Sequence, residues 1–188
     1  MYRSVIEKYI PKNEQEVVDK EAILSFINKN TDVLSRDNLI AHLTTSAFIV
    51  NKEMTRVVFA YHLIYESWAW IGGHNDNEPD CLKVAIQETN EETGLTKVHP
   101  FLKEPIMIDV IHVDNHIKNN KYVPDHLHLN LTYLLIADEN EPLIVNNLEN
   151  SGVKWFLLED MAKVTNEERM RAVYQKAYDI IVSYRRQF

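Results

Sequence analysis

The chain has little cysteine and no long apolar run, and both absences narrow its class. Cys81 is the sole cysteine among 188 residues, so no disulfide can form within the chain. No apolar stretch approaches the roughly 20 residues that a membrane-spanning helix needs. The sequence also begins without the pattern of a secretory signal. Together these features lead us to expect a protein of the reducing cytoplasm.

The chain also has no excess of positively charged residues. The chain carries 20 Lys and Arg against 28 Asp and Glu, a net charge of −8. Such a surface disfavours broad contact with nucleic acid or an acidic membrane. The negative net charge does not exclude a small anionic substrate, because a bound divalent metal ion reverses the local electrostatic field. The sequence has no internal repeat, and its 45% apolar and 26% charged residues are typical of a globular domain.

The first 41 residues predict a polar helical extension. One helix over 1–10 is ended by Pro11, a second spans 14–28, and a turn follows at 31–38. This extension could serve as a helical cap, a dimer contact or a lid, and the sequence leaves that choice open. We predict that a separate domain occupies residues 42–188.

That domain has the pattern of a sheet with helices against it. Strands rich in β-branched and aromatic residues are predicted at 43–51, 55–63, 68–71, 105–116, 126–137 and 153–158. The first two form a hairpin, and a polar loop is predicted over 117–125. A final helix over 166–185 carries one apolar face, made by Met170, Val173, Tyr174, Ala177, Ile181 and Tyr184. The order predicts an α+β or α/β fold with a mixed sheet.

Residues 72–95, GGHNDNEPDCLKVAIQETNEETGL, predict a short helix with an unusual acidic face. Pro79 suits its first turn, Asp80 complements its positive end, and Gly94 suits its C-terminal cap. Its expected core side consists of Leu82, Ala85, Ile86 and Thr89. A flexible Gly-Gly turn is expected before it.

The acidic face consists of Glu88, Glu91 and Glu92. Glu91 and Glu92 follow Glu88 by three and four residues, so all three lie on neighbouring positions of the helix surface. Like charges at these spacings repel by a few tenths of a kcal/mol each. Either the face is simply solvated, or the three carboxylates converge on Mg²⁺ or Mn²⁺, which prefer oxygen ligands.

This stretch resembles the Nudix box, G-x5-E-x7-R-E-U-x-E-E-x-G-U, where U is a bulky apolar residue. Without a gap, the pattern matches Gly73, Glu88, Glu91, Glu92, Gly94 and Leu95. The surrounding strands and terminal helix extend the resemblance over 42–185. Three positions depart from the pattern: Pro79 replaces the first Glu, Gln87 the Arg, and Thr89 an apolar residue. We interpret these as a weakened scaffold around a retained metal site.

The resemblance implies a Nudix fold and Mg²⁺- or Mn²⁺-dependent hydrolysis of a diphosphate linkage. The substrate would be a nucleoside diphosphate derivative or a related small phosphorylated molecule. The alternative is a non-catalytic nucleotide-binding module, which the changes at Pro79 and Gln87 favour. An isoprenoid diphosphate isomerase ranks lower, because Cys81 lies in the wrong segment for its catalytic cysteine. The resemblance also allows a homodimer.

The resemblance further assigns roles to the acidic residues. Glu91 and Glu92 would bind metal, and Glu88 would be a third ligand or the general base. The backbone carbonyl of Gly72 would be a further metal ligand. Glu149, in the loop before the Trp155 strand, would be an additional catalytic acid. Glu139 and Glu141 compete for that last role.

Three histidines are candidates for substrate binding. His74 follows the glycine pair and could touch a phosphate, although a surface or hydrogen-bonded structural role is slightly favoured. His126 and His128 alternate along a predicted strand, so both should point to one face. A zinc site on these histidines is disfavoured, because the sequence offers no third ligand nearby. The stretch HLHLNLTYLL resembles a segment of a subgroup of bacterial Nudix proteins, which usually has an acidic and a basic residue at the positions of Asn130 and Thr132. The replacement of both residues here disfavours that subgroup's substrate contacts.

Overall fold

The computed structural model describes residues 2–63, 66–118, 120–147 and 150–187. The chain divides into two compact units. The first unit consists of Met1–Ser46, Gly72–Ala85 and Glu104–Tyr133, and the second of Ala47–Ile71, Ile86–Lys103 and Leu134–Phe188. Four elements contribute residues to both units: strands β1 (Ala41–Val50), β4 (Ile71–His74) and β9 (His126–Ile136) and helix α3 (Cys81–Thr93).

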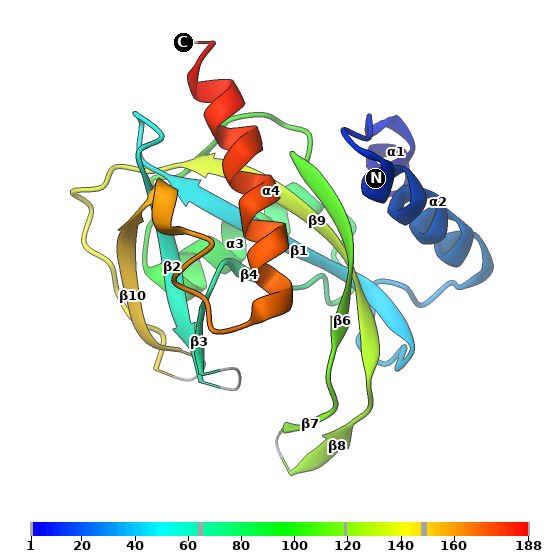
Figure 1. The fold of residues 1–188 in the computed structure, drawn as a ribbon. Coiled ribbons are helices and arrows are strands. Elements are labelled where there is room, and N and C mark those ends of the chain that lie inside the picture. The colour runs from blue at the N-terminus through cyan, green and yellow to red at the C-terminus, as the bar shows by residue number, and fades with distance from the viewer. Residues whose placement is uncertain (1, 64–65, 119, 148–149, 188) are drawn as a thin grey trace. The chain divides into compact units, whose positions relative to one another are not determined.

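The N-terminal helices of the first unit confirm the predicted helical pair. They are α1 (Tyr2–Lys8) and α2 (Glu14–Lys29), both coloured blue in Figure 1. The Asn13 side chain caps α2 by accepting a hydrogen bond from the Glu16 amide at 2.9 Å. Helix α2 packs on strand β6 (Met107–Val113), where Asp19 accepts the Val110 amide at 2.9 Å. The extension is therefore a cap on β6.

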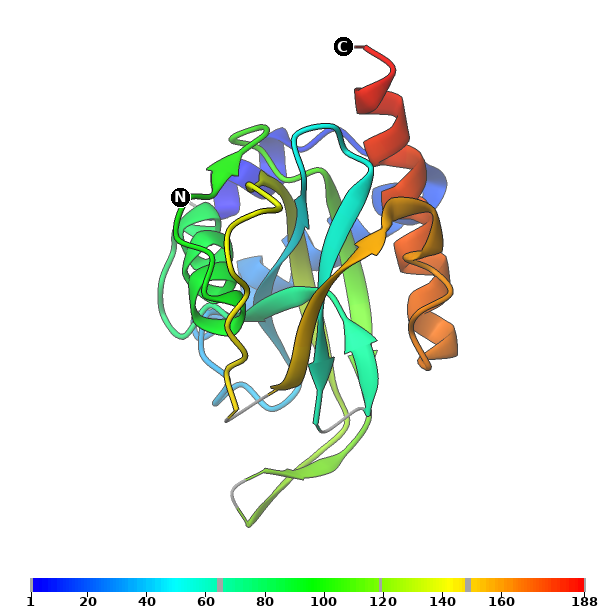
Figure 2. The same cartoon turned by 90° about the vertical axis from the view of Figure 1, so that its left-hand side faces the viewer.

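Strands β1, β4, β6 and β9 form the sheet of the first unit. β4 (Ile71–His74) pairs with β1, and β6 pairs antiparallel with β9 from Met107 opposite Thr132 to Val113 opposite His126. The predicted loop over 117–125 is wrong. It contains strands β7 (His116–Lys118) and β8 (Lys121–Val123), which extend β6 and β9 as a two-stranded ribbon (Figure 2). This hairpin is too short and polar for sequence periodicity to reveal.

The second unit contains the strand order β10-β2-β1-β9-β5, with β3 beside β2. The predicted hairpin is confirmed, because Val50 of β1 pairs with Val57 of β2. Strand β10 begins earlier than predicted, and β5 was not predicted. The bounds are β2 (Arg56–His62), β3 (Ser67–Ala69), β5 (His99–Pro100) and β10 (Asn150–Leu157).

Helix α4 (Glu168–Arg185) covers the second unit's strands through an aromatic contact, and a single turn of 3-10 helix (Leu158–Asp160) precedes it (Figure 1). The buried Tyr174 ring meets Phe48 and Phe59 edge-on, at centroid distances of 5.9 and 5.2 Å. Its hydroxyl oxygen accepts the Trp70 amide at 3.2 Å. The predicted face is largely confirmed. The buried residues are Met170, Tyr174, Ala177, Ile180, Ile181 and Val182.

The predicted class, a mixed sheet with helices packed against it, is confirmed by these elements. Within the described ranges, no helix has both the length and the apolar character needed to cross a bilayer. The predicted boundary between residues 41 and 42 stays a prediction.

Candidate functional site

Helix α3 begins at an aspartate cap. The Asp80 side chain accepts the Lys83 amide at 3.2 Å, and its carbonyl accepts the Val84 amide at 3.1 Å. Pro79 therefore precedes the cap and is not in the first turn, which corrects the prediction. Its missing N–H costs nothing there, because no helical bond is required of it.

Gly94 ends the helix, as predicted. It has φ +74° and donates its amide to the Asn90 carbonyl at 3.0 Å. A Cβ added here would lie 2.6 Å from Ile144 Cβ. The backbone angle and this close approach both require glycine, and Leu95 directly after it is fully buried.

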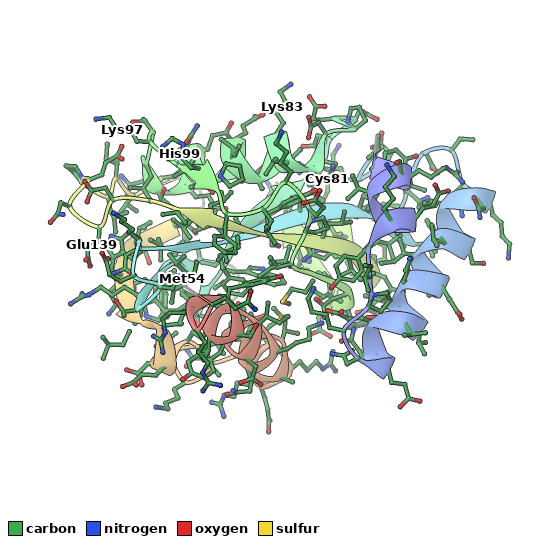
Figure 3. The ribbon with its side chains drawn as sticks, turned by 90° about the horizontal axis from the view of Figure 1, so that it is seen from above. Met54, Cys81, Lys83, Lys97, His99 and Glu139 are labelled. Carbon is green, nitrogen blue, oxygen red and sulfur yellow. The ribbon has the colours of Figure 1, made fainter. Side chains whose placement is uncertain are left out.

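The buried side of α3 differs from the predicted one. Ala85 and Thr89 are buried as expected, but Leu82 and Ile86 are only half-buried. Cys81 lies on the inner side, whereas Lys83 extends outward (Figure 3). The buried stripe consists of Cys81, Val84, Ala85, Thr89, Glu92 and Thr93. The helix is thus rotated so that one acidic residue points inward.

Glu92 is that inward acid, with 4% of its surface exposed. Its Oε2 accepts a hydrogen bond from Asn150 Nδ2 at 2.9 Å. The other side-chain atom of Asn150, Oδ1, is buried and has no hydrogen-bond partner among the described residues. Sequence reasoning missed Asn150, because the strand was predicted to start at residue 153. This pair places a carboxylate and an unsatisfied amide oxygen together.

Glu91 and Glu88 lie on the outer part of the same helix. Glu91 is exposed and accepts a hydrogen bond from Gln87 Nε2 at 2.8 Å. Glu88 is half-buried. Gln87 therefore does occupy the carboxylate-orienting position expected of the pattern's arginine, but as a neutral donor it provides no charge to offset the acidic cluster.

The side-chain oxygen atoms of helix α3 and of Asn150 are of the type that binds a hard divalent cation. The carboxylates and the unsatisfied Asn150 Oδ1 are the oxygen ligands that Mg²⁺ and Mn²⁺ prefer. The glutamates do not form one of the groups whose ligand atoms all lie within 4.8 Å of one another in the described part of the chain. Those groups are His42, His74 and His128, and the exposed set His112, Asp114 and Asp125.

The glycine pair lies in strand β4, so the expected flexible turn is wrong. A Cβ on Gly72 would lie 2.6 Å from the Thr45 carbonyl oxygen and 2.7 Å from Ser46 Cα. Glycine is therefore needed for the close approach of two backbones. Gly72 belongs to the first unit and the box glutamates to the second, so their joint role in metal binding stays a prediction.

The remaining acids of the prediction have other partners. Glu139 forms an ion pair with Arg56 at 3.2 Å. Glu141 accepts the Thr96 amide and hydroxyl, each at 2.8 Å, and these bonds lower the pKa of its carboxyl. Both residues hold loops together. The predicted catalytic acid Glu149 lies outside the described residues.

Glu78, next to the box position that Pro79 occupies, pairs with the Lys83 ammonium and accepts the Asp80 amide at 3.0 Å. These bonds, led by the one to Lys83, lower the pKa of Glu78. This acid thus supports the start of the helix.

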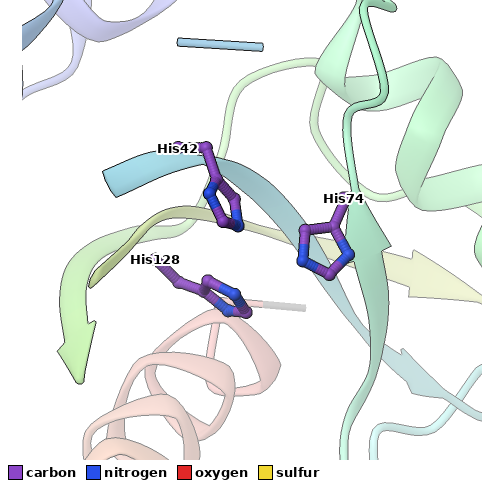
Figure 4. Close-up of side chains that lie close together, drawn as sticks. All are labelled: His42, His74 and His128. Atoms are coloured by element: carbon purple, nitrogen blue, oxygen red, sulfur yellow. The ribbon is translucent and has the colours of Figure 1, made fainter. Parts of the chain in front are cut away.

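The three predicted histidines are brought together in the first unit, and a fourth joins them. His42 of β1, His74 at the end of β4 and His128 of β9 face a common point (Figure 4). Their ring centroids are 5.0 to 5.1 Å apart. His126 lies beside them, with its Nε2 3.2 Å from His128 Nε2, which confirms the shared face of the strand. We call His42, His74, His126 and His128 the histidine cluster.

His42 was missed because no local spacing connects it to the others. It comes 32 residues before His74 and 84 before His126 in the printed sequence, and only strand pairing unites them. The third ligand whose absence disfavoured a histidine metal site is therefore present.

Hydrogen bonds fix the tautomers of two rings in the histidine cluster. His42 Nδ1 lies 2.9 Å from the Asn38 carbonyl, and His126 Nδ1 lies 2.8 Å from the Pro124 carbonyl. A carbonyl oxygen only accepts, so both Nδ1 atoms carry the proton. Both Nε2 atoms then carry lone pairs. His42 Nε2 is buried and has no hydrogen-bond partner in the described chain.

Burial disfavours protonation of three imidazoles of the cluster, those of His42, His74 and His128. It lowers the pKa of His74 to about 3, with further lowering by Arg36, and it holds the pKa of His128 well below its ordinary value. Burial also lowers the pKa of His42, against the opposing effect of the hydrogen bond to Asn38. The uncharged rings therefore keep lone pairs available at neutral pH.

Asn130 and Thr132, where the bacterial subgroup has charged residues, form a neutral network. Asn130 Oδ1 accepts from Thr44 and Ser46 at 2.9 and 3.0 Å, and its Nδ2 donates to Thr132 at 3.0 Å. These bonds connect β1 to β9 and satisfy the buried polar side chains. The two residues support the strands that carry His42 and His128.

Comparison with known proteins finds likeness in structure. No family model and no curated protein matches the chain. A Nudix-family hydrolase from Clostridium perfringens has a TM-score of 0.54 and 24% identity, over 74% of this chain and 97% of its own. A C. elegans Ap4A hydrolase has a TM-score of 0.54 and 18% identity, over 74% and 98%.

The E. coli dihydroneopterin triphosphate pyrophosphohydrolase has a TM-score of 0.52 and 14% identity, over 71% of this chain and 92% of its own. At these identities the likeness concerns the arrangement of the backbone. It agrees with the sheet, the position of α3 between β4 and β6 in the sequence, and the terminal helix. The chain adopts the fold of the Nudix hydrolases.

Proposed function

We propose that the chain is a Mg²⁺-dependent pyrophosphohydrolase that cleaves a diphosphate linkage in a nucleoside diphosphate derivative or a related small molecule. The observation that carries this proposal is the acidic helix α3, whose buried Glu92 adjoins the unsatisfied Asn150 Oδ1. The Ap4A hydrolase and the dihydroneopterin triphosphate pyrophosphohydrolase among the similar structures are named for substrates that contain such linkages.

Glu92, Glu91 and Asn150 would hold the cation. Glu92 is fixed by burial and by the Asn150 amide, so its carboxylate is preorganised. Glu91 is exposed and can leave the neutral Gln87 at small cost. When bound, Mg²⁺ neutralises phosphate oxygens and lowers the pKa of a bound water.

In this proposal, Glu88 or Glu149 removes the proton from the attacking water. Glu88 is half-buried on the helix that carries the ligands, which suits either a third ligand or a base. Gly72 would add its carbonyl oxygen. His74, which follows the glycine pair, and His126 and His128 of β9 would contact the phosphates of the substrate.

A second function, nucleotide binding without hydrolysis, is favoured by one observation. Gln87 provides no positive charge to offset the acidic face, and Glu91 bonds to it along the helix. In that case a nucleotide would raise the melting temperature of the protein with no product formed.

The test is a substrate panel with purified full-length protein and a Mg²⁺ titration. Nucleotide sugars, dinucleoside polyphosphates and nucleoside triphosphates are incubated with enzyme, and phosphate and mononucleotide release are measured. We expect turnover of at least one compound, dependent on Mg²⁺. Stabilisation by a compound that is never cleaved would favour the binding module.

Substitutions of the glutamates of α3 test whether hydrolysis depends on this helix. Glu92→Gln and Glu91→Gln should lower kcat/KM, whereas Glu53→Gln, which changes an exposed acid in the turn between β1 and β2, should not. Glu88→Gln and Glu149→Gln identify the base by their pH–rate profiles. Equal activity in Glu92→Gln and the unaltered enzyme would overturn the assignment.

A further inference from the structure

The geometry points to a second metal site: we propose that His42, His74 and His128 bind a divalent transition-metal ion of the zinc class. The site consists of nitrogen donors from three strands of the first unit, β1, β4 and β9. It shares no residue with the acidic face of α3. His74 and His128 are also the residues proposed above to contact substrate phosphates, and Zn²⁺ uptake measured without substrate tests the metal site whether or not the chain hydrolyses diphosphates.

The three rings have the spacing of a ligand set. One nitrogen from each lies within 4.8 Å of one from the others (Figure 4). Nitrogens bound to one tetrahedral Zn²⁺ at 2.0–2.1 Å are about 3.4 Å apart. The nitrogens of the cluster, which lie within 4.8 Å of one another, must therefore move closer together by up to about 1.4 Å when an ion binds.

The buried Nε2 atom of His42 is a second observation that points to a metal ion. Its Nδ1–H donates to the Asn38 carbonyl, and its Nε2 is buried with no hydrogen-bond partner in the described chain. Buried polar atoms are nearly always satisfied. A ring that donates one N–H to a backbone carbonyl while its other nitrogen lies beside two further imidazoles has the arrangement of a metal-binding histidine.

His126 positions His128 beside the site. Its Nδ1–H donates to the Pro124 carbonyl, and its Nε2 lies 3.2 Å from His128 Nε2, within hydrogen-bond distance. The ring thereby restricts rotation of His128. Two residues of β9 thus form a fixed pair, while β1 and β4 each contribute a ring.

Imidazole donors determine the class of the ion. Neutral imidazoles suit Zn²⁺, Cu²⁺, Ni²⁺ and Fe²⁺, whereas Mg²⁺ requires oxygen ligands. The group consists of histidines alone, and the sulfur of Cys81 lies 3.4 Å from Asn75 Nδ2. The ion therefore differs in kind from the cation proposed for the carboxylates.

The experiment titrates the metal-free full-length chain with Zn²⁺ in the presence of a competing chelator, and with Co²⁺ followed by visible absorption. We expect uptake of a single ion per chain at the cluster and the intense Co²⁺ bands of a four-coordinate site. His74→Gln and His128→Gln should each weaken Zn²⁺ binding by at least about tenfold. These residues are half-buried and tolerate the change better than His42.

The controls separate this site from the acidic face of α3 and from other histidines. His99→Gln alters an exposed histidine of β5 and should leave Zn²⁺ uptake unchanged. Glu92→Gln should also leave it unchanged, and circular dichroism verifies that each variant is folded. Absence of tight Zn²⁺ uptake by the unaltered chain, or uptake that survives both histidine substitutions, would overturn the proposal.

Discussion

The histidine cluster and the acidic face of α3 are two groups of candidate metal-binding residues built in opposite ways. The histidine cluster comes from three strands, and backbone carbonyls accept hydrogen bonds from two of its rings, His42 and His126. The acidic face is charged and lies along a single helix, with neutral amides from Gln87 and Asn150 as partners. One presents nitrogen, the other oxygen.

The difference teaches how each group tolerates the absence of a cation. Neutral imidazoles can be buried together because burial suppresses their protonation. Carboxylates stay charged, so they remain partly exposed or accept hydrogen bonds from amides. The first arrangement is sensitive to acid and to strand packing, and the second to added charge.

The largest effect is expected from Gly72→Ala, which would disturb the strands of the histidine cluster. The added Cβ meets backbone atoms of β1 at 2.6 and 2.7 Å, so β4 must move. We expect the free energy of unfolding in urea to fall by about 3 kcal/mol. Gly152→Ala is the control, because its Cβ meets the Trp68 ring at 3.2 Å and that side chain can shift. Equal losses in the two variants would contradict this account of β4.

Acid should destabilise the histidine cluster next most strongly. His74 titrates near 6.5 when unfolded but has a pKa of about 3 when folded. Below pH 6.5 the unfolded chain therefore binds more protons, and stability falls as the pH falls toward 3. The loss between pH 7 and pH 5 is about 2 kcal/mol for this residue. Chemical denaturation at a series of pH values should show a shallower dependence in His74→Gln, and an unchanged slope would refute the buried neutral state.

The effect of Asn150→Asp tests the acidic face. It places a second carboxylate 2.9 Å from that of Glu92 in a buried position. We expect a loss of about 2 kcal/mol without metal, and partial recovery of the melting temperature with Mn²⁺. Asn147→Asp, the same change at an exposed position, should have no such effect. A stability loss that Mn²⁺ leaves untouched would argue against cation binding beside Glu92.

The smallest effect is expected from Gln87→Arg. Arginine would give Glu91 a charge-assisted partner in place of the neutral amide at 2.8 Å. Both positions are exposed, so stability should rise by only about 0.5 kcal/mol or less, and the gain should vanish in high salt. A gain of more than about 1 kcal/mol would show that the acidic face is far less solvated than its exposure indicates.

The same comparison explains what the sequence could predict. The acidic face was found because helix period places Glu88, Glu91 and Glu92 together within five residues. Gly94 as a cap and the apolar face of α4 are likewise local patterns, and both are confirmed. Local periodicity is sufficient for features that a single element determines.

Features that depend on pairing between distant segments were not predictable in this way. His42 joins His74 and His128 only through the order of the strands. Asn150 reaches Glu92 from the start of a strand whose true beginning lay three residues before the predicted one. The orientation of α3 was also mistaken, because its buried side includes a glutamate that hydrophobic periodicity assigns to solvent.

The central claim, that the acids of α3 bind a divalent cation, is tested most directly by calorimetric titration with Mn²⁺. The account predicts uptake by the unaltered chain, weakened at least about tenfold in Glu92→Gln and unchanged in His74→Gln. Imidazoles bind Mn²⁺ least well among the first-row divalent ions, so the histidine cluster should contribute little. No uptake, or equal affinity in Glu92→Gln and the unaltered chain, would contradict the claim.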